Sequence, residues 1–225
     1  NMPKNFKAVV IDNKDEKFTR EVKDLNNDHL KDGNVLIRID FSSLNFKDAL
    51  ILNNGGRIVK KYPFVPGIDF SGTVEQSEDE KFKKDDKVIL TGFRVGEIYY
   101  GGFSQYAKVN SDFLVKLPKD LTNKKAMMMG TAGLTALLCS FAVKAKEELL
   151  MGSKVKDVLV TGATGGVGSF AVMALSKMGY DVHAVTGKKD KHDYLKKLGA
   201  KNILDRKEFL GESKLLEKGM WDCVV

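Results

Sequence analysis

The sequence predicts a mixed α/β protein, with a barrel or sandwich of short strands in its first half and a doubly wound parallel sheet in its second half. As far as about Leu117, short apolar runs alternate with clusters of Gly, Asp, Asn and Lys, which is typical of β structure. From about Asn123 the apolar period becomes helical, and strand and helix patterns then alternate, which indicates βαβ units. We therefore expect one domain over residues 1–120 and a second over residues 121–225.

The first half contains runs with the length and composition of strands, namely FKAVVID, NVLIRIDFSSL, SGTVEQS, DKVILTGF and SQYAKVN. Strands this short, separated by turn residues, are typical of barrels and sandwiches. The segment VKLPKDLT that follows is predicted to be a linker.

The second half begins with an apolar stripe at helical spacing, formed by Ala126, Met127, Gly130, Leu134, Leu137, Leu138 and Phe141. After it we expect strands over residues 157–161, 181–186 and 202–204, helices over residues 168–178 and 192–198, and a last apolar run, WDCVV. This alternation predicts a parallel sheet. Val225 falls inside an expected buried strand, whereas domains usually end in surface segments, so we expect this sequence to be the first part of a longer chain.

The composition is that of a globular chain with a sizeable core, because 43% of its 225 residues are hydrophobic. The formal net charge of +7 comes from lysines scattered along the chain, without a basic motif interleaved with aromatics, so no nucleic-acid partner is expected. The only cysteines, Cys139 and Cys223, stand in apolar surroundings, which argues against a disulfide framework.

No membrane span or signal peptide is expected. The most apolar stretch, residues 126–143, is interrupted by glycines and hydroxyl residues, so no uninterrupted run reaches the roughly 18 residues that a span requires. The N-terminus lacks the hydrophobic core of a secretory signal. We therefore expect a cytoplasmic protein.

The segment ATGGVG, from Ala163 to Gly168, has the G-x-G-x-x-G spacing with Ala in the first position, between a predicted strand and a predicted helix. In this context Gly165 allows the backbone to approach a pyrophosphate, and Gly168 allows the helix to pack close to the strand. The N–H groups that open the helix would receive the negative charge. A purely structural strand-to-helix turn is the alternative.

The end of the second strand decides between the two nicotinamide dinucleotides. A carboxylate about 20 residues after the loop would accept the ribose 2′-hydroxyl of NAD, but the sequence here is Thr186-Gly187-Lys188-Lys189. A hydroxyl, an open backbone and ammonium groups suit a 2′-phosphate. The sequence therefore predicts NADP(H); the alternative is that these lysines belong to a solvated loop.

Taken together, the chain resembles the zinc-free medium-chain dehydrogenase/reductase superfamily, and within it the acrylyl-CoA reductase group, also labelled quinone oxidoreductase-like. The segments that carry the resemblance are SSLNFKDAL, PGIDFSGTV, LTGFRVGE, GTAGLTA, VTGATGGVGS, HDYLKKLGA and LEKGMWDCVV, and they span nearly the whole chain. The resemblance implies a GroES-like β-barrel catalytic domain followed by a Rossmann domain that we expect to be truncated at its C-terminus here, and a homodimer when the chain is full length.

The resemblance also implies chemistry without zinc. Relatives that bind zinc have a Cys and a Gly-His-Glu run at the catalytic metal, where this chain has Asn45 and Gly67-Ile68-Asp69. The three histidines, His29, His183 and His192, lack ligand spacing, so no metal site is expected.

Without a metal, the implied activity is NADPH-dependent reduction of the carbon–carbon double bond of an enoyl thioester such as acrylyl-CoA. Hydride passes to the β-carbon, a proton reaches the α-carbon, and the protein stabilises the enolate. Two alternatives stay open. One is an NADPH quinone or enone oxidoreductase, and the other is a non-catalytic nucleotide-binding regulator or RNA binder.

The resemblance assigns the predicted catalytic residues to the segment SSLNFKD, as Asn45, Phe46 and Lys47. Phe46 stands where relatives often have Tyr, so an acid role at this position is in doubt. Lys47 and its neighbour Asp48 have two interpretations: they take part in catalysis, or they form an ion pair that fixes the loop. The second interpretation is at least as good as the first. Arg57 and Lys60 are candidates for CoA phosphates, or members of a solvated loop. Asp69 is predicted to brace the barrel, with proton transfer as the alternative.

The remaining predicted site residues bind the cofactor. Phe46, Thr131 and Thr135 are assigned to the nicotinamide and its ribose. The pyrophosphate is assigned to Thr164, Gly165, Gly166 and Val167, and the 2′-phosphate and adenosine end to Thr186, Gly187, Lys188 and Arg206.

Overall fold

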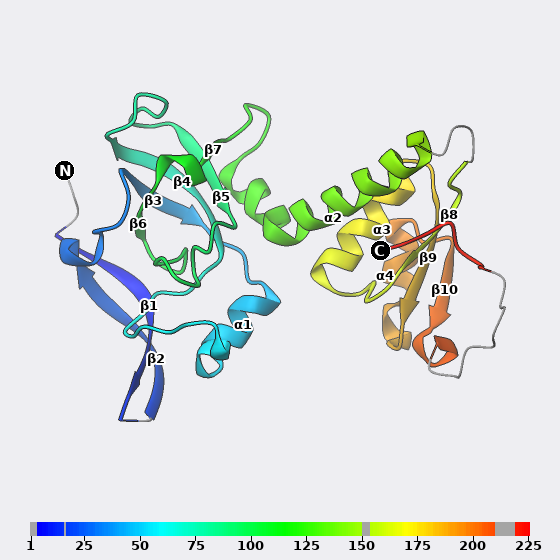
Figure 1. Ribbon diagram of the computed structural model, residues 1–225, viewed down its shortest axis with the longest axis horizontal. Coiled ribbons are helices and arrows are strands. Elements are labelled where there is room, and N and C mark those ends of the chain that lie inside the picture. Colours follow the sequence, from blue (N-terminus) through cyan, green and yellow to red (C-terminus); the bar gives the residue numbers. More distant parts are fainter. Residues whose placement is uncertain (1–3, 16, 150–153, 210–218) are drawn as a thin grey trace. The chain divides into compact units, whose positions relative to one another are not determined.

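The computed structural model describes residues 4–15, 17–149, 154–209 and 219–225. The chain forms two compact units, Asn1–Thr131 and Ala132–Val225 (Figure 1). The predicted linker 115–122 precedes helix α2 (Asn123–Leu149), and the units divide inside α2, next to Gly130. Each unit is described by itself below.

The first unit is built on an antiparallel five-stranded sheet with the order β6-β3-β4-β5-β7. Its strands are β3 (Val35–Phe41), β4 (Asp69–Ser77), β5 (Lys87–Thr91), β6 (Tyr106–Val109) and β7 (Val115–Lys116). A second pair, β1 (Asn5–Lys14) and β2 (Lys17–Asn26), is also antiparallel. Short helical elements connect these strands: η1 (Asn27–His29), α1 (Phe46–Leu52), η2 (Asn54–Arg57) and η3 (Ser111–Phe113).

Both faces of the first half of β3 are buried, which is why Val35, Leu36 and Ile37 are all apolar, whereas Arg38 and Asp40 stand in its less buried second half. Val35 and Ile37 pack with Phe70 of β4 in one cluster, whereas Leu36 packs with Phe6 of β1 in another. Successive side chains of a strand point to opposite faces, so covering on both sides requires an uninterrupted apolar run. Register shifts between β3 and β4 at residues 36–37 and 39–41 bend the sheet.

The second unit contains a parallel four-stranded sheet in the order β10-β9-β8-β11, as predicted. Its strands are β8 (Asp157–Val160), β9 (Asp181–Thr186), β10 (Asn202–Asp205) and β11 (Cys223–Val224). They are connected by α3 (Gly166–Lys177), η4 (Lys189–Lys191), α4 (His192–Leu198) and η5 (Arg206–Phe209). The strand order reverses at β8, between β9 and β11, and ligands of doubly wound sheets bind at such a reversal.

The apolar stripe predicted for α2 divides into a buried and an exposed part. Ala126 and Met127 are buried, but Leu134, Leu137, Leu138 and Phe141 are exposed. After the kink, α2 buries Gly133, Ala136, Ser140 and Val143. Small residues on that face allow close packing against the sheet core, so residue size outweighs hydrophobicity there.

By length and mean hydropathy, α2 is also the one helix among the described residues that is long and apolar enough to cross a membrane. This differs from the sequence expectation, which counted uninterrupted runs instead of an average over a window. In the structure, α2 is interrupted at Gly130, which has non-helical dihedral angles (φ 51°, ψ −153°). Its residues Ala136 and Val143 belong to the core of the second unit.

Carboxylates fix the N-terminal edge of the parallel sheet. Asp222 accepts hydrogen bonds from the N–H groups of Lys156 (2.8 Å) and Asp157 (2.9 Å), and Asp181 pairs with Lys201 at 2.7 Å. The two N–H groups lower the pKa of Asp222 below its ordinary value of 3.8, because they bind only the ionised form well.

A pH prediction follows from Asp222. A lowered pKa means that its contribution to stability is present above 3.8 and is lost as the pH falls through the folded-state pKa. We expect the thermal midpoint of the wild type to fall between about pH 5 and about pH 3, and Asp222→Asn to be less stable near pH 7 with a shallower pH dependence. Calorimetry across this range tests it, with Asp120→Asn, at an exposed site, as the control. Equal slopes for D222N and the wild type would contradict the assignment.

Candidate functional site

In the second unit, the predicted phosphate loop connects β8 to α3 through a tight turn. Gly162 has a φ of +54°, and its carbonyl accepts the N–H of Gly165 at 2.8 Å. A Cβ on Gly168 would lie 2.3 Å from that same carbonyl oxygen, so only glycine fits there. The sequence prediction that Gly168 allows a close approach of helix and strand agrees with this geometry.

The N-terminus of α3 lacks a side-chain cap. Gly165 is the N-cap residue, with extended backbone (φ −79°, ψ 174°) and no side-chain hydrogen bond to the first turn. The N–H groups of Gly166 and Val167 therefore depend on water or a ligand for partners, and the helix dipole favours an anion at this position. Because α3 has 12 residues, its dipole is well developed.

A pocket of about 420 Å³ joins this loop to the ends of β9 and β10. It brings together several of the predicted cofactor residues, with Thr161, Gly162 and Thr164 from the loop, Val185, Thr186, Gly187 and Lys188 from the end of β9, and Arg206 and Phe209 from η5. Among the residues that the structure describes, the lining includes two cations and no carboxylate, which is the composition expected for a phosphate site. Gly165, Gly166 and Val167, also predicted for the pyrophosphate, are not among the residues that line this pocket; they follow Thr164 directly, at the start of α3.

Sequence reasoning missed Phe209, whose ring is 42% exposed and lines this pocket. The available signal was its spacing: Arg206 and Phe209 are three residues apart in a 3₁₀-helix, where side chains at that spacing align. Arg206 is also near Gly187, because a Cβ on Gly187 would be 3.9 Å from the Arg206 Nε.

In the first unit, the predicted catalytic segment is organised by the buried carboxylate of Asp69, at the start of β4. Asp69 Oδ1 accepts the N–H of Ser43 at 3.0 Å, and Ser43 Oγ lies 2.6 Å from both carboxylate oxygens. Asp69 Oδ2 accepts the Asn45 amide at 3.0 Å, and the N–H and hydroxyl of Thr131 at 2.9 and 2.7 Å. One carboxylate thus joins the loop before α1 to α2.

Gly130 makes the Thr131 contacts possible. Its φ of 51° and ψ of −153° break the helix, so the N–H of Thr131 turns to Asp69 instead of a helical carbonyl. A Cβ on Gly130 would be 2.3 Å from Ser43 Oγ and 3.0 Å from Asp69 Oδ2. The resemblance assigned Thr131 to the nicotinamide ribose; in the structure its hydroxyl donates to Asp69. Thr135 lies one helical turn further on, in the second unit.

A second buried carboxylate, Asp48, holds Asn45 from the other side. Asp48 accepts the N–H of Asn45 at 2.8 Å, its amide at 3.2 Å and the N–H of Ile68 at 3.0 Å. Burial raises the pKa of Asp48, and these hydrogen bonds oppose the increase. Since the Asn45 amide donates to both Asp48 and Asp69, its orientation is fixed.

The other two predicted catalytic residues are more exposed. Phe46 is 80% exposed at the start of α1. The Lys47 ammonium makes an ion pair with the Glu97 carboxylate at 2.6 Å. The ion pair with Asp48 that the sequence suggested does not form. Glu97 was not predicted, and a partner 50 residues away leaves no local signal in the sequence.

Among the described residues, no group of three or more His, Cys, Asp or Glu side chains is arranged to hold a metal ion. His29 belongs to η1 and His192 to α4. His183 of β9 is buried and lies 2.7 Å from Asp157 Oδ1.

The network around Asp69 gives a stability prediction. Asp69→Asn keeps the shape of the side chain but replaces a carboxylate oxygen with an amide that turns its own hydrogens toward the buried donors. Leaving buried donors unsatisfied costs about 1–3 kcal/mol, so we expect a loss of this size in the free energy of unfolding, measured in urea. The exposed Asp120→Asn serves as the control and should change it by less than about 0.5 kcal/mol. A D69N protein as stable as D120N would show that Asp69 does not hold the network together.

Comparison with known proteins supports the fold and identifies the family. The model of the "Alcohol dehydrogenase GroES-like domain" family matches residues 31–119, which lie in the first unit. Over 223 residues the chain is 48% identical to the acrylyl-CoA reductase AcuI of Ruegeria pomeroyi, covering 97% of this chain and 67% of that protein.

Two solved structures share both the fold and much of the sequence. The yhdH oxidoreductase of Salmonella enterica, in complex with NADP, superposes with a TM-score of 0.90 at 45% identity, over 97% of this chain and 66% of that one. The Bacillus subtilis protein yhfP, with NAD bound, superposes with a TM-score of 0.90 at 39% identity, over 99% and 67% of the two chains. The chain spans 65–67% of the length of the first curated relatives it matches. With similarity of this degree across nearly all of its residues, the chain belongs to the quinone oxidoreductase-like group of the medium-chain dehydrogenase/reductase family, which includes the acrylyl-CoA reductases.

Proposed function

We propose that the protein binds NADP(H) and reduces the carbon–carbon double bond of an enoyl thioester such as acrylyl-CoA. The observation that carries the proposal is the pocket after β8, where the glycine loop, Lys188 and Arg206 converge and no carboxylate of the described residues lines the wall. The relative from R. pomeroyi, named an acrylyl-CoA reductase, and the NADP complex of the S. enterica protein support it.

The residues of the second unit fit the proposed cofactor. The N–H groups of Gly166 and Val167, at the start of α3 that lacks a side-chain cap, would bind the pyrophosphate together with Thr164 and Gly165. Thr186, Gly187, Lys188 and Arg206 would hold the 2′-phosphate, and Phe209 offers a ring to the adenine. When bound, the nicotinamide supplies the hydride.

In the first unit we assign the substrate side to Asn45, Phe46 and Lys47. The Asn45 amide is held by Asp48 and Asp69, so it can meet a polar group of the substrate or cofactor without first losing rotational freedom. The exposed ring of Phe46 offers an apolar surface to the same reactants. Glu97 holds the Lys47 ammonium in place, which keeps a positive charge next to α1 where it can stabilise negative charge on an enolate.

A quinone or enone oxidoreductase is the second candidate, and the family's quinone oxidoreductase-like character favours it. Both reactions need the same hydride donor and differ only in the acceptor. A nucleotide-binding regulator without turnover is the third outcome that the following experiment can give.

The substrate class is tested by following NADPH oxidation with acrylyl-CoA and, separately, with 1,4-benzoquinone. We expect kcat/KM for acrylyl-CoA to exceed that for the quinone by about tenfold or more, because only the thioester presents both a polarised alkene and a large group for binding. A higher kcat/KM for the quinone would favour the second candidate. Tight NADPH binding with no turnover of either compound would favour the regulator.

The cofactor preference is tested at Lys188, which is decisive because yhfP was solved with NAD. Loss of a charge-assisted hydrogen bond costs about 1.5–3 kcal/mol, so Lys188→Ala should weaken NADPH binding by about tenfold or more and leave NADH binding almost unchanged. Fluorescence titration measures both affinities. Lys189→Ala, next in sequence but outside the pocket lining, is the matched control. If K188A changes the NADPH-to-NADH affinity ratio no more than K189A does, the 2′-phosphate assignment is wrong.

A further inference from the structure

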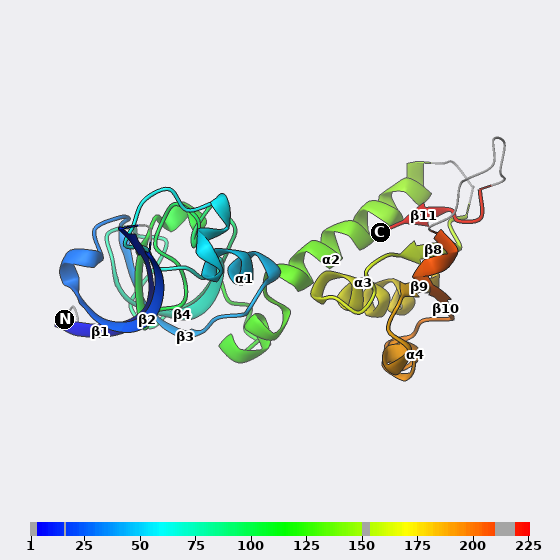
Figure 2. The same ribbon diagram turned by 90° about the horizontal axis from the view of Figure 1, so that it is seen from below.

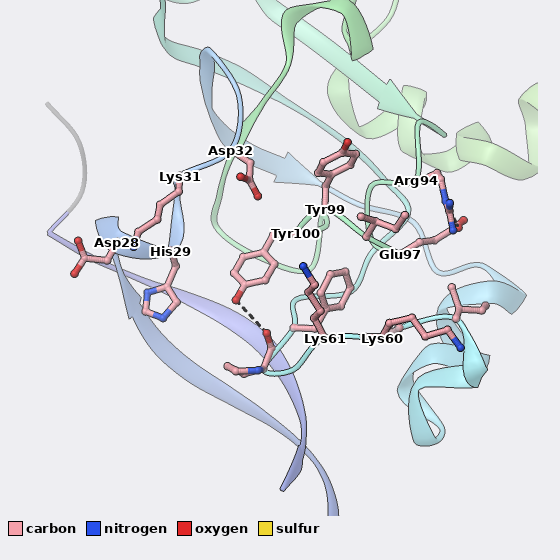
Figure 3. Close-up of a pocket in the computed structure, with 15 residues that line it drawn as sticks. Asp28, His29, Lys31, Asp32, Lys60, Lys61, Arg94, Glu97, Tyr99 and Tyr100 are labelled. Carbon is pink, nitrogen blue, oxygen red and sulfur yellow. Dashed lines mark hydrogen bonds and ion pairs between the residues drawn. The ribbon is translucent and has the colours of Figure 1, made fainter.

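The first unit contains a pocket of about 690 Å³, larger than the one after β8, and none of the residues assigned to the cofactor lines it (Figure 3). Three segments line it, residues 28–32, 58–64 and 94–100. Its volume is within the range of about 300–1,000 Å³ that small-molecule sites have. All three segments belong to the first unit, so the pocket is complete within it.

The wall of this pocket is aromatic and held in place. The rings of Phe64 and Tyr100 meet edge to face, with centroids 5.6 Å apart, and the Tyr100 hydroxyl donates to the carbonyl of Pro63 at 3.1 Å. Phe64 and Val59 are buried, whereas Tyr99 and Ile98 are exposed at the rim. A flat apolar group could therefore pack against a ring whose orientation is already fixed.

Charged side chains of both signs surround this wall. In Figure 3, Asp28 and Lys31 lie to the left of Tyr100 and Asp32 lies above it, whereas Lys60, Arg94 and Glu97 lie to its right. Among the described residues, Lys60 and Lys61 make no ion pair. Arg94 shares Glu97 with Lys47, at 3.6 and 2.6 Å respectively, so that one carboxylate is divided between two cations. Lys60, Lys61 and Arg94 therefore carry more positive charge than the Glu97 carboxylate neutralises.

This arrangement matches a phosphorylated purine nucleoside. Phosphates suit the lysines and Arg94, a purine ring suits the aromatic wall, and the exocyclic amine of adenine can donate to a carboxylate on the opposite side. A purely apolar ligand would leave the charges without partners, and a simple anion would leave the aromatic wall unused.

We propose that this pocket binds the nucleotide end of a coenzyme A thioester, its 3′-phosphorylated ADP group. The inference rests on the proposed function, because it places the substrate's non-reacting end. Glu97 links the pocket to the substrate side of the same unit: it lines the pocket and holds Lys47, which follows Asn45 and Phe46. The flexible pantetheine arm of coenzyme A would run from this pocket toward α1.

The first test measures binding alone. Because the cofactor pocket also suits adenosine phosphates, coenzyme A is titrated calorimetrically into protein saturated with NADP⁺. Lys60→Glu/Lys61→Glu reverses two charges at the pocket, and Lys83→Glu/Lys84→Glu makes the same change at exposed lysines outside it. We expect the K60E/K61E protein to bind coenzyme A at least about tenfold more weakly, and K83E/K84E to bind it as the wild type does.

The second test compares acrylyl-CoA with acrylyl-N-acetylcysteamine, which has the same thioester but no nucleotide. The ratio of kcat/KM for acrylyl-CoA to that for the short thioester should fall by about tenfold in K60E/K61E and stay unchanged in K83E/K84E. Equal ratios and equal coenzyme A affinities in the two double variants would overturn the inference while leaving the proposed function standing. If no form reduces either thioester, the proposed function fails, and the calorimetric result still decides whether the pocket takes the nucleotide.

Discussion

The carboxylate of Asp69 accepts hydrogen bonds from Ser43, Asn45 and Thr131, which come from two segments far from it in sequence. It can do so only because Gly130 breaks α2 and frees the N–H of Thr131, and because no Cβ at Gly130 occupies the space next to Ser43. A buried carboxylate is costly unless donors surround it, so the donors and the acceptor require each other. These hydrogen bonds to Asp69 therefore fix the position of the Asn45 side chain and the position of Thr131 at the break in α2.

The two units use opposite strategies to position polar groups. In the first unit, side chains are held by carboxylates inside the fold, as Asn45 is between Asp48 and Asp69. In the second unit, backbone N–H groups and the cations Lys188 and Arg206 are left available around a turn made of glycines (Figure 2 shows α3 following β8). In the function that we propose, the first arrangement orients a group for the reaction, and the second binds the charged cofactor.

Much of this was readable from the sequence, wherever the determinant was local. The glycine loop, the parallel strands and the lysine in place of a carboxylate at the end of β9 are all local patterns. Strand β2 was missed because KFTREVKDLN buries only one of its residues, Leu25, and so lacks an alternating pattern. The role of Asp69 was underestimated because its partners are 24 to 62 residues away, and Lys47 pairs with Glu97 instead of its neighbour for the same reason. Contacts between residues far apart in the sequence form only in the folded chain, so no regular residue spacing in the sequence predicts them.

The central claim is that the pocket after β8 selects a nicotinamide dinucleotide by its 2′-phosphate. The most direct measurement is displacement of fluorescent NADPH from the protein by 2′,5′-ADP and by 5′-ADP. We expect saturable NADPH binding that 2′,5′-ADP displaces at a concentration about tenfold or more below that of 5′-ADP, because only 2′,5′-ADP carries a phosphate on the ribose 2′-oxygen for Lys188 and Arg206 to bind. Equal displacement by both compounds, or no binding of NADPH, would contradict it.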